Sequence, residues 1–161
     1  KAGGKASAQV FDVTKLDAKA IPIMPRRIRV HGVVEDAVAS SGREGITVDV
    51  PPDLEAQADP LVVERVVTNL VANAFNYGEP PVVVTAVQLD RHLRIAVADA
   101  GPGVADELVP RLFERFERGR TGEGSGLGLA IARAYARAHG GDLVYDPVGD
   151  GARFELIIPT R

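Results

Sequence analysis

Apolar residues recur at helical spacing in three stretches of this chain. Residues 31–41, 59–77 and 126–139 carry apolar side chains three or four positions apart, which predicts three helices with one buried face each. The second helix has clear limits, because Asp59 can cap its first turn and Pro60 suits its first helical position. Its apolar stripe consists of Val63, Val66, Val67, Leu70 and Ala74. Residues 105–118 are expected to form shorter helical pieces.

Runs of β-branched and alternating apolar residues predict the strands, which are 45–50, 81–89, 92–98, 142–147 and 152–158. Asp90 and Arg91 form a tight turn between the second and third of these runs, so the two strands should pair as an antiparallel hairpin. The last two runs should form another hairpin. Three helices with about five strands predict an α+β fold, a two-layer α/β sandwich with a mixed, mostly antiparallel sheet.

The beginning of the chain follows a different pattern. Residues 1–8 are small and polar, like a linker, and residues 9–17 place three apolar side chains on one helical face. Pro22 and Pro25 then prevent a helix from continuing. The first residue is Lys1 rather than Met, so we expect the chain to be a piece of a larger protein.

Composition narrows the classes of function. The chain has 161 residues, a net charge of −3 and 45% hydrophobic residues, which suits one globular domain. Its net acidity argues against nucleic acid as a partner. The absence of cysteine excludes a disulfide framework, a thiolate zinc site and a cysteine nucleophile. No stretch approaches the about 20 consecutive apolar residues that a membrane helix needs.

Three asparagines occur within eight positions of the second predicted helix. Asn69 and Asn73 lie one turn apart on the same flank, and Asn76 and Tyr77 follow there. Asparagine is unfavourable inside a helix, because its side chain competes for backbone hydrogen bonds. Two interpretations remain open: a solvated polar edge, or amide groups that face a phosphate or a hydrated cation. Mg²⁺ prefers oxygen ligands and keeps several waters, so one amide oxygen can suffice.

A glycine-rich loop follows the third predicted strand. Asp99 stands at the end of the strand, with Gly101 and Gly103 after it. A carboxylate here can accept a hydrogen bond from an exocyclic amine, and the glycines let the backbone approach a flat ligand. The alternative is an ordinary Asx turn.

A second glycine-rich stretch runs directly into the third predicted helix. It has glycine at every second position, namely Gly122, Gly124, Gly126 and Gly128. Backbone N–H groups at a helix N-terminus can bind an anion, but a loop that merely leads into the helix is the alternative. Four arginines precede it: Arg111, Arg115, Arg118 and Arg120. They could bind phosphate oxygens or pair with neighbouring glutamates at the surface.

In this order, the motifs resemble the ATP-binding catalytic domain of bacterial sensor histidine kinases, in the superfamily that includes gyrase, heat-shock chaperones and mismatch-repair ATPases. The matching segments are ERVVTNLVANAFNYG (64–78), VADAGPGV (97–104), LFERFERG (112–119), GSGLGLAIARAYARAHGG (124–141) and GARFELIIP (151–159). The resemblance covers roughly residues 26–161, which would be the catalytic domain. It implies that residues 1–25 are a linker and the tail of a truncated dimerisation helix.

The resemblance implies ATP and Mg²⁺ as ligands. Asn73 would reach Mg²⁺, Asn69 would lie nearer the phosphates, Tyr77 would lie along the adenine and Asp99 would accept the adenine amine. Phe113 and Phe116 would anchor the lid over the nucleotide. The implied nucleotide-binding residues are Asn69, Asn73, Asn76, Tyr77, Asp99, Gly101, Gly103, Arg118, Arg120, Gly124, Gly126, Leu127, Gly128 and Leu129.

Two features depart from the family pattern. Asn76 stands where the family often has lysine, so neutralisation of the phosphates would fall to Arg118 or Arg120. The lid is also short, because only residues 117–123 separate Phe116 from the glycine box.

A histidine kinase transfers the γ-phosphoryl group to a histidine that is followed by an acidic residue. His31, His92 and His139 precede glycine, leucine and glycine, so none fits, and we interpret His139 as structural. The chain is therefore expected to be a monomer that binds ATP, with no catalytic residue of its own, because the acceptor histidine lies elsewhere.

The resemblance also implies partners and a location. The partners would be the dimerisation and phosphoacceptor domain of the parent kinase and a response regulator. The domain would be cytoplasmic, in a parent protein that can be anchored in a membrane. Two alternatives stay open: an ATP-hydrolysing switch of the gyrase or chaperone type, and a degenerate module that docks partners without nucleotide.

Overall fold

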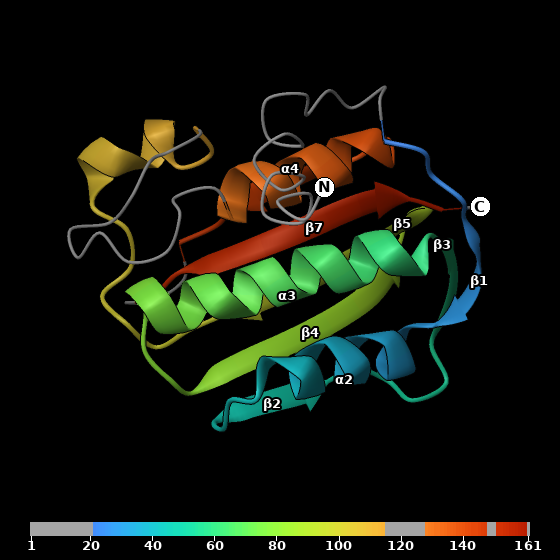
Figure 1. Cartoon of the computed structure of the whole chain (residues 1–161), viewed down its shortest axis with the longest axis horizontal. Coiled ribbons are helices and arrows are strands. Elements are labelled where there is room, and N and C mark those ends of the chain that lie inside the picture. The colour runs from blue at the N-terminus through green and yellow to red at the C-terminus, as the bar shows by residue number, and fades with distance from the viewer. Residues whose placement is uncertain (1–20, 115–127, 148–150, 161) are drawn as a thin grey trace, which may run out of the picture.

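A five-stranded sheet forms one layer of the molecule in the computed structural model, which describes residues 21–114, 128–147 and 151–160 (Figure 1). The strand order is β2 (Ile46–Asp49), β4 (Val82–Leu89), β5 (His92–Ala98), β7 (Arg153–Pro159) and β6 (Asp142–Tyr145). β2 and β4 are parallel, and all other neighbours in this sheet are antiparallel. The predicted mixed, mostly antiparallel sheet is therefore confirmed.

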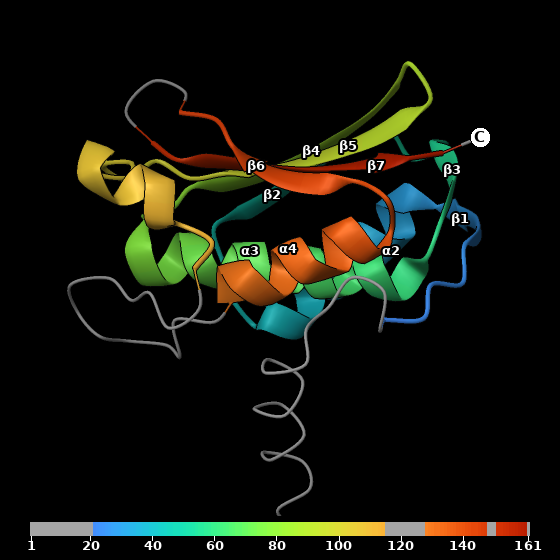
Figure 2. The same ribbon diagram turned by 90° about the horizontal axis from the view of Figure 1, so that it is seen from above.

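Within the described ranges, three α-helices form the second layer and cover one face of the sheet (Figure 2). They are α2 (Val30–Ser41), α3 (Pro60–Tyr77) and α4 (Gly128–Ala138), and α3 lies between the other two. The core between the layers joins the apolar stripe of α3 to the inward side chains of the central strands, including Leu70, Leu93, Ile95 and Leu156. The predicted two-layer sandwich is confirmed. None of the helices in the described part of the chain is long and apolar enough to cross a membrane.

The limits of the helices follow from their capping residues. Asp59 caps α3 as predicted, because its side chain accepts a hydrogen bond of 2.9 Å from the backbone N–H of Leu61. Gly42 ends α2 with φ of 68°, a left-handed conformation that favours glycine. The helical pieces expected within 105–118 are represented by the 3₁₀ helix η2 (Asp106–Arg111), and residues 115–118 lie outside the described part.

Two short strands were not predicted. β1 (Arg26–Arg29) and β3 (Glu55–Ala58) form a separate antiparallel ribbon. β1 buries only Ile28, and β3 contains no β-branched residue, so neither carries the pattern from which a strand is recognised. Their pairing instead follows from the buried contacts of Ile28, Ala56 and Ala58 with the core.

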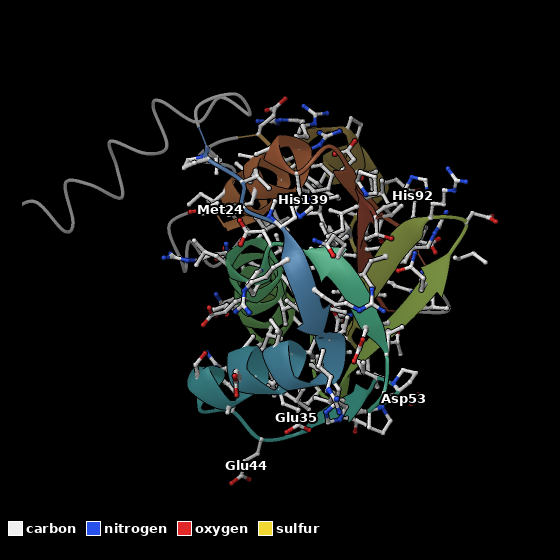
Figure 3. The ribbon with its side chains drawn as sticks, turned by 90° about the vertical axis from the view of Figure 1, so that its right-hand side faces the viewer. Met24, Glu35, Glu44, Asp53, His92 and His139 are labelled. Carbon is white, nitrogen blue, oxygen red and sulfur yellow. The ribbon has the colours of Figure 1, made fainter. Side chains whose placement is uncertain are left out.

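Asp59 also joins the chain before β1 to helices α3 and α4. Its second carboxylate oxygen accepts the backbone N–H of Met24 at 2.8 Å. Its own backbone N–H donates to Nε2 of His139, the residue after α4, at 2.9 Å. Figure 3 shows Met24 and His139 at the same end of the molecule. His139 is buried, which confirms the structural role predicted for it.

Candidate functional site

The asparagine flank lies on the C-terminal half of α3. Leu70 and Ala74 are buried on one side of the helix, and this fixes its rotation. Asn69, Asn73 and Asn76 are then left half-buried at the border of the core. Tyr77 is half-buried as well, in the last position of the helix. The four residues therefore line one helical edge, as the spacing predicts.

Asp99 sits at the end of β5, next to the C-terminus of α3. Its backbone N–H donates to the carbonyl oxygen of Ala152 at 3.0 Å, and the N–H of Ala100 donates to the carbonyl oxygen of Glu79 at 2.8 Å. The carboxylate oxygen Oδ1 accepts the N–H of Gly101 at 2.8 Å. The Asx turn weighed from the sequence is thus present. It fixes the carboxylate beside the end of α3, so the turn and a ligand role are compatible.

Close backbone approach explains two glycines around this carboxylate. A Cβ atom on Gly78 would lie 2.5 Å from both oxygens of Asp99. A Cβ atom on Gly101 would lie 2.8 Å from Cα of Gly78 and 2.9 Å from the nitrogen of Glu79. Gly103 has φ of 80°, which L side chains rarely adopt. The loop after β5 therefore packs tightly against the loop after α3, and the Asp99 carboxylate lies where the two loops meet.

The start of α4 approaches the asparagine flank. A Cβ atom on Gly128 would lie 3.9 Å from Oδ1 of Asn69, which is ordinary van der Waals contact. Leu129, the next residue, packs against the core. The structure thus brings the end of the glycine box to the same flank of α3 that carries Asn69 and Asn73.

Several predicted site residues lie outside the described part of the chain. These are Arg118, Arg120, Gly124, Gly126 and Leu127, together with the lid residue Phe116. Arg111 is described, and it forms a surface ion pair of 3.4 Å with Glu114. For Arg111, this ion pair agrees with the alternative that the arginines pair with neighbouring glutamates at the surface.

Gly78 and Gly151 are part of this arrangement, although sequence reasoning did not single them out. A Cβ atom on Gly151 would collide with the carbonyl oxygen of Asp99. Gly78 directly follows the asparagine motif, so its place in the sequence could have identified it as a residue of the candidate site. Gly151 could be found only from the pairing of β5 with β7, which sets Ala98 opposite Arg153.

No group of three or more His, Cys, Asp or Glu side chains that could hold a metal ion occurs among the described residues. A divalent cation near α3 would therefore depend on amide oxygens, on a phosphate ligand and on water. Mg²⁺ is commonly bound in this way, with few protein ligands and several retained waters. The half-buried asparagine flank fits such a cation, with Asn73 one helical turn from Asn69.

Comparisons with known proteins place this fold and these motifs in a family. The family of histidine kinase-, DNA gyrase B- and HSP90-like ATPases matches residues 58–161. The chain belongs to this family. Domains of the family bind ATP.

The relatives and solved structures point to one branch of the family. A probable sensor histidine kinase of Mycobacterium tuberculosis is 39% identical over 150 residues, which cover 89% of this chain but 38% of that protein. The structure of the mycobacterial sensor histidine kinase MprB has 29% identity and a TM-score of 0.72, and the match covers 84% of this chain and 99% of that one. Full-length ShkA in complex with AMPPNP has 28% identity and a TM-score of 0.76, covering 94% of this chain and 34% of that one. These names favour the kinase branch over the gyrase and chaperone branches.

Proposed function

We propose that this chain is the Mg-ATP-binding catalytic domain of a sensor histidine kinase, spanning residues 26–161, and that residues 1–25 are a linker and the tail of a dimerisation helix. The observation that carries the proposal is the position of the Asp99 carboxylate. It lies between the end of α3 and the loop of Gly101, and the start of α4 approaches Asn69 further back along the same helix. The adenine and phosphate ends of a nucleotide could be bound along this flank.

Asp99 would select the base. Its Oδ1 oxygen already accepts the Gly101 N–H, and an ionised carboxylate has further acceptor capacity at its other oxygen. The exocyclic amine of adenine can donate to that oxygen. Guanine has a carbonyl oxygen at the same place. Because this oxygen and the carboxylate are both hydrogen-bond acceptors, they would repel each other. ATP would therefore bind better than GTP.

Asparagine amides would bind the other end of the nucleotide. Asn73 would offer its amide oxygen to Mg²⁺, and Asn69, beside Gly128, would lie nearer the phosphates. The cation would supply charge neutralisation on the phosphate oxygens. The N-terminus of α4 would add backbone N–H groups with partial positive charge. The roles of Tyr77, Asn76, Arg118 and Arg120 in binding remain part of the same proposal.

The γ-phosphoryl group would be transferred to a histidine of a dimerisation domain, and then to a response regulator. Each of the three histidines contacts a group within the described part of the chain. His139 accepts the Asp59 N–H, Nδ1 of His92 lies 2.9 Å from the carbonyl oxygen of Asp90, and His31 lies 3.6 Å from Glu35. Phosphoryl transfer depends mainly on positioning and charge neutralisation, so the nucleotide and the acceptor can be held by separate domains.

The test uses γ-labelled ATP and two proteins, this chain alone and the full-length protein that contains it. We expect acid-labile, base-stable label on the full-length protein and none on the chain alone. The Asn73→Ala variant of the full-length protein should lose the label while it remains folded. Steady release of phosphate by the chain alone, with no labelled histidine in the full-length protein, would instead support a gyrase-like switch.

A further inference from the structure

A cluster of aromatic side chains and one arginine holds the segment that follows the Asp99 loop. Arg133 lies on α4, and its guanidinium carbon is 4.6 Å from the centre of the Phe113 ring. The same guanidinium donates to Asp142 on β6, from Nε to Oδ1 at 2.9 Å and from Nη2 to Oδ2 at 3.4 Å. Arg133 therefore links α4, β6 and the segment that contains Phe113.

The segment is held at its other end by Tyr145. The backbone N–H of Val104 donates to the Tyr145 hydroxyl oxygen at 3.3 Å. Tyr145 and Phe113 both contact Phe154 on β7, with ring centres 5.2 Å and 6.2 Å apart, and the second pair is edge to face. Between the two ends, η2 contributes no buried residue. The position of residues 104–113 therefore depends largely on these end contacts.

Asp142 keeps Arg133 in a fixed orientation. Burial raises the pKa of Asp142, but the Arg133 hydrogen bond, the Leu143 N–H and the charges of Arg133 and Arg137 together hold that pKa below its ordinary value. The carboxylate is thus ionised at neutral pH and binds the planar guanidinium with both oxygens. Lysine could not replace this contact, because a point charge lacks both the two-pronged geometry and the flat face that stacks on Phe113.

We propose that Arg133 is a positioning residue for the nucleotide site: it stacks on Phe113 and so holds residues 104–113 against α4. This inference rests on the proposed function, since residues 104–113 directly follow Gly101 and Gly103 of the proposed adenine contact. Release of Phe113 would loosen the backbone next to those glycines. Arg133 would therefore affect nucleotide affinity without touching the nucleotide.

Arg137 provides the matched control. It lies one turn further along α4 and also contacts Asp142, with Nε 3.3 Å from Oδ1. The cation–π contact on Phe113 belongs to Arg133 and not to Arg137 among the described contacts. Arg133→Gln and Arg137→Gln each remove one partner of Asp142, and only the first removes the stacking contact.

Two measurements on both variants test the inference. In the nucleotide-free chain, hydrogen exchange at the Val104, Leu108 and Leu112 amides should become about three- to tenfold faster in Arg133→Gln, given the usual strength of a cation–π contact, and stay unchanged in Arg137→Gln. Calorimetry should show Mg-ATP affinity about three- to tenfold weaker in Arg133→Gln alone. Urea unfolding of both variants shows how much of each effect is a general loss of stability.

The outcomes separate this inference from the proposed function. Equal effects of the two substitutions on exchange and affinity, or no effect of Arg133→Gln on either, would overturn the positioning role. If the unaltered chain binds no Mg-ATP while the exchange difference between the variants persists, the proposed function fails and Arg133 acts on the segment alone. Rescue of exchange and affinity by Arg133→Lys would also contradict the argument from guanidinium geometry.

Discussion

Gly78 offers the most direct way to disturb the proposed adenine contact without touching a polar group. In the Gly78→Ala variant, the new methyl group would lie 2.5 Å from both carboxylate oxygens of Asp99. Gly78 has φ of −114°, outside the left-handed region that favours glycine, so its φ is no obstacle to alanine. The Asp99 side chain must therefore rotate away from Gly78.

The size of the effect follows from the contacts of that carboxylate. Rotation breaks the 2.8 Å hydrogen bond from the Gly101 N–H to Asp99, and a hydrogen bond to a charged group contributes about 1.5–3 kcal/mol to stability. The displaced carboxylate also cannot meet the adenine amine. Loss of a second charged hydrogen bond of the same size predicts Mg-ATP affinity about tenfold to a hundredfold weaker.

Calorimetric titration with Mg-ATP and urea unfolding are the assays, and Gly32→Ala is the control. Gly32 lies in α2, is exposed, and a Cβ atom there would meet nothing within 4 Å. That substitution should leave ATP affinity unchanged and stabilise the chain by about 1 kcal/mol through helix propensity. If Gly78→Ala is folded and binds Mg-ATP as tightly as the unaltered chain, the assignment of Asp99 to adenine is refuted.

Three further variants test the stabilising contacts described above. The folded-state pKa of Asp142 is below its ordinary value of 3.8, so its ionised form stabilises the fold fully above that pH, and this stabilisation is lost as the pH falls through the lower folded value. In urea titrations between pH 7 and pH 3, the free energy of unfolding should therefore fall further for the unaltered chain than for Asp142→Asn. Equal losses in the two proteins would contradict this. Asp90 and Arg91 form the β4–β5 turn with φ of 54° and 65°, and asparagine followed by glycine is the preferred pair for two positive φ angles. The double variant Asp90→Asn, Arg91→Gly should therefore raise the free energy of unfolding by about 1 kcal/mol. A decrease would contradict this turn conformation. Asp59→Ala removes a helix cap and a buried acceptor, and should lower the free energy of unfolding by about 2 kcal/mol; no change in urea midpoint would show that the cap is unimportant.

Elements with a strong local pattern could be predicted from the sequence. The apolar stripe from Val63 to Ala74 predicted α3, and Asp59 with Pro60 predicted where its first turn begins. The Asp90-Arg91 turn identified the central hairpin, whose register pairs Leu89 with His92. In each case, the residues that define the element are close together in the sequence. Long-range pairing was not needed to recognise them.

The ribbon of β1 and β3 could not be predicted, because its strands are far apart in the sequence and bury few side chains. The same limit applies to the site. The asparagine flank and Asp99 were visible as motifs, yet the contact of Gly78 with Asp99 depends on how the end of α3 meets the end of β5. The stack of Arg133 on Phe113 likewise joins two segments that no sequence pattern relates.

The central claim is that Asp99 and the asparagine flank bind Mg-ATP, and calorimetric titration of the nucleotide tests it most directly. The experiment compares the unaltered chain with Asp99→Asn, and ATP with GTP. We predict saturable binding of Mg-ATP that is weakened in Asp99→Asn, and no binding of GTP. Absence of Mg-ATP binding, or equal affinity for the two nucleotides in both proteins, would contradict the account.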